Sequence, residues 1–198
     1  NGEPSILLEP SRTNNVVNSN SSFTANNTTI TYNNINSPEG IQNAFKVECT
    51  SSGTAVFART ASITYTDVAF SVFVKYGNAQ YMQFLTSHTA DHFFNFDVQN
   101  GVFGTKGSLT SNLQAVEYPN GWYRVSGTFT GGTGSGTFRV YLSNSNSATF
   151  GGGTATVGDF YYAYGWQVEN GSYTTSLIHT SGSAVTRSAD VANNAGNS

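Results

Sequence analysis

The chain has 198 residues, a formal net charge of -3 and only 10% charged residues, against roughly 25% in an average soluble domain. Because it is mildly acidic and has no cluster of Lys and Arg, it lacks the electrostatic footprint of a nucleic-acid-binding protein. No apolar run approaches the roughly 18 residues of a membrane-spanning helix, and no signal-peptide pattern opens the chain, so we expect a soluble protein without membrane insertion.

Alternation of apolar and polar residues predicts β-strands along most of the chain, and helical periodicity is nearly absent. In chain order the predicted strands are Ser5–Glu9, Ala44–Cys49, Thr54–Thr60, Val68–Tyr76, Gln80–Thr86, Phe93–Val98, Trp122–Thr130, Thr137–Ser143, Asp159–Glu169 and Ala184–Val191. The Asn- and Thr-rich stretch Asn14–Asn36 is expected to be a loop, and residues 1–6 and 192–198 are expected to be flexible ends.

Gly, Asn and Pro separate these strands, as in chains that fold back by short turns. Asn100-Gly101 predicts a hairpin, because a type I′ turn needs the positive φ that these residues tolerate. Many short strands joined this way predict an all-β fold, an antiparallel two-sheet β-sandwich of the jelly-roll kind, as one domain over residues 1–198. The single cysteine, Cys49, excludes an internal disulfide and a cysteine-based zinc site, and is expected to be half-buried in its strand.

Several motifs occur in a fixed order over almost the whole chain. They are Leu7–Asn14 (LLEPSRTN), Ser71–Lys75 (SVFVK), Asn120–Ser126 (NGWYRVS), Tyr164–Glu169 (YGWQVE), Thr174–Thr180 (TTSLIHT) and Thr186–Asp190 (TRSAD). This set resembles a jelly-roll domain of phage tail fibres and head fibres that is similar to carbohydrate-binding modules. Trp166, Leu177 and His179 depart from the pattern, which usually has Ala, Tyr and Pro there.

The resemblance implies a module on a virion surface or an extracellular protein, with a polysaccharide or cell-surface glycan as its partner. It also implies a homo-oligomer, a trimer for example, or contacts with other virion proteins.

Carbohydrate binding needs flat aromatic faces for the sugar and planar polar groups for its hydroxyl pairs. The motifs predict that Tyr164, Trp166 and Val168 face the core. The opposite sheet face would then present the candidate ligand-binding residues, which are Phe73, Lys75, Arg139, Tyr141, Tyr161, Gln167 and Glu169. The alternative is a face that is solvated or covered by a neighbouring subunit.

Metal ligation has two candidates in the sequence. The carboxylates of Glu9, Asp159 and Asp190 suit a structural calcium, because a jelly roll brings its terminal strands together and calcium prefers oxygen ligands. Nothing in their spacing demands the ion, so no cofactor is expected to be required. His88 and His92 would face one another only on a helix; this region is expected to be a hairpin, which favours a solvated loop over a zinc site.

Enzyme motifs are lacking, since no nucleophile elbow, zinc-protease helix or phosphate loop occurs. The stretch Phe73–Gln80 faintly resembles a strand of jelly-roll alginate lyases, but its Gln is displaced by one residue and the companion Q-x-H motif is missing. The sequence therefore predicts a non-catalytic virion-surface or fibre module that binds glycans. A purely structural fibre or capsid-appendage subunit without glycan affinity is the first alternative, and a polysaccharide lyase is the second.

Overall fold

The computed structural model of the chain describes residues 8–61, 66–131 and 136–191, with residues 58–60 described by their backbone alone. These residues form strands, one short 3-10 turn at Pro119–Gly121 and no α-helix. The described part of the chain thus holds no helix long and apolar enough for a membrane span. Both predicted flexible ends, and all but two residues of the predicted strand Ser5–Glu9, lie outside the described residues.

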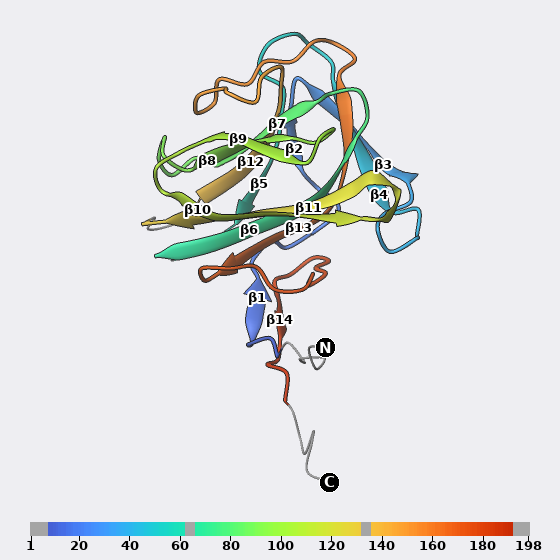
Figure 1. The fold of residues 1–198 in the computed structure, drawn as a ribbon. Helices are drawn as coiled ribbons and strands as arrows, with labels where there is room; N and C mark the ends of the chain where they lie inside the picture. Colours follow the sequence, from blue (N-terminus) through green and yellow to red (C-terminus); the bar gives the residue numbers. More distant parts are fainter. Residues whose placement is uncertain (1–7, 62–65, 132–135, 192–198) are drawn as a thin grey trace, which may run out of the picture.

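Two six-stranded sheets pack face to face (Figure 1). Sheet I has the spatial order β10 (Thr110–Tyr118), β11 (Trp122–Thr130), β6 (Asp67–Tyr76), β13 (Phe160–Asn170), β4 (Ala44–Cys49) and β3 (Thr28–Ile35). Sheet II has the order β2 (Thr24–Asn26), β5 (Val56–Ala61), β12 (Gly136–Ser143), β7 (Tyr81–Thr86), β8 (Phe93–Asp97) and β9 (Val102–Lys106). The strand pairs are antiparallel and the chain crosses repeatedly between the sheets, which confirms the predicted jelly-roll sandwich.

A short ladder of β1 (Arg12–Asn14) and β14 (Val185–Arg187) lies below the sandwich in Figure 1 and joins the two ends of the described chain. Nearby, the Glu9 amide donates to the Asp190 carboxylate at 3.0 Å. The first and last segments of the described chain are therefore held together at one end of the molecule.

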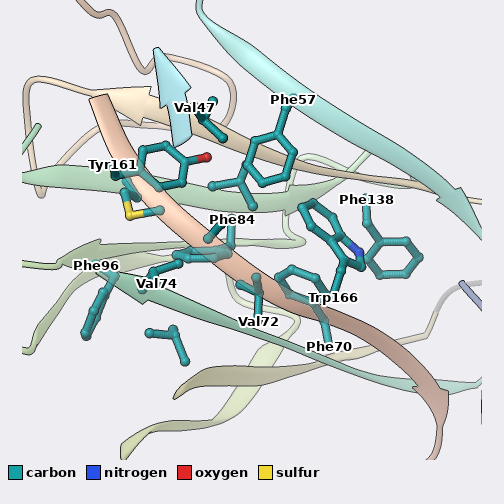
Figure 2. Close-up of a cluster of buried hydrophobic side chains, with 14 of the residues drawn as sticks. Val47, Phe57, Phe70, Val72, Val74, Phe84, Phe96, Phe138, Tyr161 and Trp166 are labelled. Carbon is teal, nitrogen blue, oxygen red and sulfur yellow. The ribbon is translucent and has the colours of Figure 1, made fainter. Parts of the chain in front are cut away.

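Aromatic side chains fill the space between the sheets, as Figure 2 shows. The Trp166 ring lies 4.9 Å from the Phe57 ring, 5.0 Å from Phe70 and 5.5 Å from Phe23, measured between centroids. Each such pair adds about 0.5–1.5 kcal/mol beyond its buried area. Trp166 therefore contributes a large aromatic ring to the core. Cys49 in β4 is fully buried in the core, so the expectation that it is half-buried is wrong.

The edges of the sheets differ most from the predicted strands. The expectation that Asn14–Asn36 is a loop is wrong, because it contains β2 and β3, each at the edge of its sheet. An edge strand has one neighbour and little buried surface, so its Thr and Asn residues need not alternate with apolar ones. The same reason explains β10, another edge strand that the sequence pattern did not reveal.

The hairpin predicted at Asn100-Gly101 joins β8 to β9. Its turn is longer than a type I′ turn, and of these two residues only Gly101 has a positive φ, of 70°. The Asp97 carboxylate accepts hydrogen bonds from the amides of Gln99 and Asn100 at 3.0 and 2.9 Å, which fixes the loop. The predicted hairpin is confirmed. Its turn is not of the predicted type I′, and the Asp97 carboxylate stabilises it.

Before a β-bulge in β13 the alternation is the reverse of the prediction, and after the bulge Trp166 and Val168 face the core as predicted. The register against β6 shifts between Tyr164 and Gln167, where Gly165 has a φ of 65°. As a result Tyr161 faces the core before the bulge and Trp166 faces it afterwards, whereas Tyr164 lies on the outer face of sheet I. The expectations that Tyr164 faces the core and that Tyr161 faces outward are therefore wrong.

Candidate ligand-binding groove

The seven predicted ligand-binding residues do not share one face. Arg139 and Tyr141 lie on β12, which belongs to sheet II, and point away from its core residues. The outer face of sheet I carries Phe73, Lys75, Gln167 and Glu169, while Tyr161 is in the core. The expected single face is wrong because alternation along a strand does not reveal the sheet to which the strand belongs.

Tyr161 is a core residue. Its side chain is fully buried, and its hydroxyl has no hydrogen-bond partner among the described residues. Burial raises the pKa of this hydroxyl well above its ordinary value. The side chain is therefore inaccessible to a ligand in this structure.

Gln167 and Glu169 are also fully buried, and they fasten a segment of the chain to the outer face of sheet I. The Glu169 carboxylate accepts hydrogen bonds from Gln167 Nε2 at 2.7 Å, from the Thr175 amide at 3.0 Å and from Thr175 Oγ1 at 2.5 Å. Gln167 Oε1 accepts a hydrogen bond from the Ile178 amide at 2.6 Å. These hydrogen bonds occupy the polar groups of both side chains, so Gln167 and Glu169 have a structural role here.

Phe73 lies under the same segment. It packs with Trp122 and Tyr164, and Leu177 covers this cluster. The Arg124 guanidinium lies 5.6 Å from the centre of the Phe73 ring, and its Nη2 donates to the Thr175 carbonyl at 2.6 Å. Only a small cavity of about 210 Å³ remains beside Phe73.

Arg139 and Tyr141 line a groove of about 440 Å³ on the outer face of sheet II. Its other lining residues come from β2, β5 and β12 and from the loop before β5, and they are Thr24, Asn26, Thr54, Val56 and Thr137. The alternation of β12 builds one wall, because Phe138, Val140 and Leu142 are fully buried on the opposite side. The outward position of Arg139 and Tyr141 agrees with the predicted pattern of this strand.

The floor of the groove is formed by Val56 and Tyr141, which belong to an apolar cluster of sheet II. Val56, Leu85, Phe93 and Tyr141 form a cluster against which Phe150 packs. The Tyr141 side chain is only 7% exposed, so its ring belongs mostly to this floor. Its hydroxyl has no hydrogen bond to a described residue and is not among the fully buried polar atoms, so it reaches the groove.

A loop beside the groove is held in place by two buried amides that the sequence patterns missed. Gln83 Nε2 donates to the Thr149 carbonyl at 2.9 Å, and Asn95 Nδ2 donates to the Ala148 carbonyl at 2.8 Å. The two side chains also bond to each other at 3.0 Å. The signal in the sequence was the presence of Gln83 and Asn95 in strands rich in aromatic residues, because a buried side-chain amide needs hydrogen-bond partners.

Arg139 is the one charged residue among the described lining residues of the groove, and the others are neutral. The structure describes seven of the eight Lys and Arg side chains, all but Arg59. Among those seven, only Lys75 and Arg139 lack a hydrogen bond, ion pair or ring contact with a described residue. The half-buried Arg139 guanidinium thus offers its planar donors to whatever enters the groove.

The three carboxylates predicted to hold calcium do not meet. Glu9 binds Arg187 at 2.5 Å and accepts the Ser176 amide at 2.8 Å, and its own amide bonds to Asp190. Asp159 precedes β13, and its carboxylate accepts the Thr156 amide at 2.8 Å instead. Within the described ranges, no group of three His, Cys, Asp or Glu residues could hold a metal ion.

The His88–His92 turn is not simply a solvated loop. His92 is fully buried, and its Nε2 lies 2.8 Å from the Thr130 carbonyl, to which it donates as a protonated nitrogen. Burial lowers the pKa of His92, and the neighbouring His88 lowers it further, against the raising effect of the Thr130 bond. The hydrogen bond to Thr130 therefore uses Nε2 of the buried ring, which favours a structural role for His92 over metal ligation.

No protein-family model matches the sequence, and no curated protein matches it.

Proposed function

We propose that the chain is a non-catalytic glycan-binding module and that the sheet II groove is its binding site. The observation that carries the proposal is the free guanidinium of Arg139 beside the open hydroxyl of Tyr141, over an apolar floor. A guanidinium can donate to two neighbouring sugar hydroxyls, while the floor receives the C–H face of the ring. The rim of Thr and Asn side chains adds neutral donors and acceptors.

The size of the groove supports the same class of ligand. About 440 Å³ lies within the roughly 300–1,000 Å³ typical of small-molecule sites. The buried amides beneath the neighbouring loop hold this region before a ligand arrives, which reduces the entropy lost on binding. On the family resemblance, we place the module on a virion surface or an extracellular fibre, as a homo-oligomer. Light scattering that gives a mass above the 21.1 kDa of one chain would support that assembly.

A glycan-array screen of the chain, followed by calorimetric titration of each hit, tests the proposal. Arg139→Gln removes the charge and Tyr141→Phe removes only the hydroxyl. We expect Arg139→Gln to weaken binding about tenfold or more, since a hydrogen bond to a charged group is worth about 1.5–3 kcal/mol. Tyr141→Phe should weaken it several-fold, as a neutral hydrogen bond is worth about 1 kcal/mol.

Lys106→Gln is the matched control, because Lys106 is a cation on β9 of the same sheet and does not line the groove. It should leave binding in the sheet II groove unchanged. If no glycan binds, the structural fibre subunit becomes the better function. If glycans bind equally to wild type and to both groove variants, the site lies elsewhere.

A further inference from the structure

A second cleft, of about 680 Å³, lies on the outer face of sheet I and has no connection with the sheet II groove. Its walls come from the end of β3, the loop that follows, the turn before β11, and the strands β6 and β13. The described lining residues are Asn34, Ile35, Asn36, Gln42, Lys75, Asn120 and Tyr162. Amide side chains, one cation and one aromatic ring thus surround the space.

Strand pairing places Lys75 and Tyr162 side by side at the base of this cleft. They are register partners on β6 and β13, so their Cβ atoms lie about 4.5–5.5 Å apart and on the same face. Val74, the neighbour of Lys75, is fully buried in the core, so alternation sends Lys75 outward. Tyr162 precedes the bulge in β13 and therefore also faces outward.

The polar groups of the cleft are not used within the described part of the chain. The Lys75 ammonium, the Tyr162 hydroxyl and the amide groups of Asn34, Asn36 and Asn120 have no hydrogen bond to another described residue. Gln42 is different, because its Nε2 donates to the Asn33 carbonyl at 2.9 Å and braces the loop that forms one wall. The cleft therefore combines a braced wall with free donors and acceptors.

The charge of the cleft is positive. None of its described lining residues is acidic. Charged groups on β4 and on the loop before it are already paired: Lys46 binds Glu48 at 2.6 Å, and Glu39 accepts the Tyr164 hydroxyl at 2.6 Å. Lys75 is thus an uncompensated cation in a chain whose net charge is negative.

We infer that this cleft is a second saccharide-binding site, and that it takes glycans bearing an anionic group, a carboxylate or a sulfate. Lys75 would pair with the anion, and the amides of Asn34, Asn36 and Asn120 would bind hydroxyls around it. The partly buried Tyr162 ring supplies the apolar surface. Because the two sites lie on opposite outer faces of the sandwich, one chain would bridge two glycan strands. The inference does not depend on the sheet II groove.

A panel of anionic glycans tests the inference, with polygalacturonate, alginate, hyaluronan, sialyllactose and heparin fragments as probes. Binding to the wild-type chain is measured by calorimetry in low and in moderate salt. At least one probe should bind, lose about tenfold or more in affinity in Lys75→Gln, and weaken as salt screens the charge. Lys106→Gln is the control, because Lys106 is a cation on β9 that lines neither site, and the affinity of this variant for that probe should equal that of wild type.

Three results would overturn the inference. One is that no anionic probe binds. Another is that the methyl ester of a bound uronate binds as tightly as the acid, which would remove the role of the charge. The third is equal binding of polyglutamate, which would indicate a general polyanion surface. Loss of binding in Arg139→Gln but not in Lys75→Gln would support the sheet II groove while refuting this site, so the two proposals fail separately.

Discussion

Removal of the Tyr161 hydroxyl should change the stability of the fold by an amount that can be calculated from the structure. The side chain is fully buried, and Figure 2 shows its oxygen among apolar side chains of the core. No described residue pairs with this oxygen. The substitution Tyr161→Phe deletes only the unpaired hydroxyl and keeps the ring, which packs 6.0 Å from the Phe57 ring.

Burying a hydroxyl without a hydrogen bond costs about 1–3 kcal/mol in proteins. Tyr161→Phe should therefore raise the free energy of unfolding by about 1 kcal/mol or more. For a domain of this size, about 1 kcal/mol corresponds to an increase of about 2–4 °C in the melting temperature. A stabilising change at a tyrosine is the opposite of what most substitutions do.

Thermal and urea unfolding of wild type and variant measure the effect. Tyr162→Phe is the matched control, because its hydroxyl is open to solvent on the next residue of the same strand. It should change the free energy of unfolding by less than about 0.5 kcal/mol. A clear destabilisation by Tyr161→Phe would show that the hydroxyl has a partner in solution, and weaker glycan binding with unchanged stability would return Tyr161 to the binding residues.

Two further predictions concern buried polar groups. Glu169→Ala leaves buried donors of Gln167 and Thr175 without an acceptor. We therefore expect urea unfolding to show a loss of about 3 kcal/mol or more in the free energy of unfolding, and a smaller loss in Glu169→Gln, which keeps one acceptor. Equal losses in the two variants would refute this role of the carboxylate. Because the pKa of His92 is below its ordinary value of 6.5, the unfolded chain gains a proton first as the pH falls, and stability should decline below about pH 6.5. His92→Gln should flatten that decline, and an unchanged slope would contradict the assignment.

The motifs that carry the family resemblance have structural roles at several positions in this chain. Asn14 Nδ2 donates to the Trp166 and Ile178 carbonyls at 3.2 and 2.8 Å, and Asn14 Oδ1 accepts the Val168 amide at 3.1 Å. Glu9 binds Arg187 across the two ends of the described chain. These contacts join segments that are more than 150 residues apart, which explains why the motifs lie far apart in the sequence.

Alternation by itself determined the β class, most strands and the faces of individual strands. On β12 it placed Phe138 and Val140 inside and Arg139 and Tyr141 outside, because neighbouring side chains of a strand point to opposite faces whatever surrounds it. It failed on β13 at Gly165, although a glycine inside a strand is a known signal for a bulge. Edge strands such as β3 gave little pattern because they bury little.

Only the tertiary structure decided which candidate residues can act together. Arg139 and Lys75 belong to different sheets because β12 pairs with β5 and β7, while β6 pairs with β11 and β13. Those pairings join residues far apart in the chain, and nothing local to either strand encodes them. In the same way, alternation placed Glu169 among the candidate ligand-binding residues, yet Gln167 and Thr175 satisfy its carboxylate in the interior. A polar residue is buried wherever distant segments supply its hydrogen bonds, and that supply exists only in the folded chain.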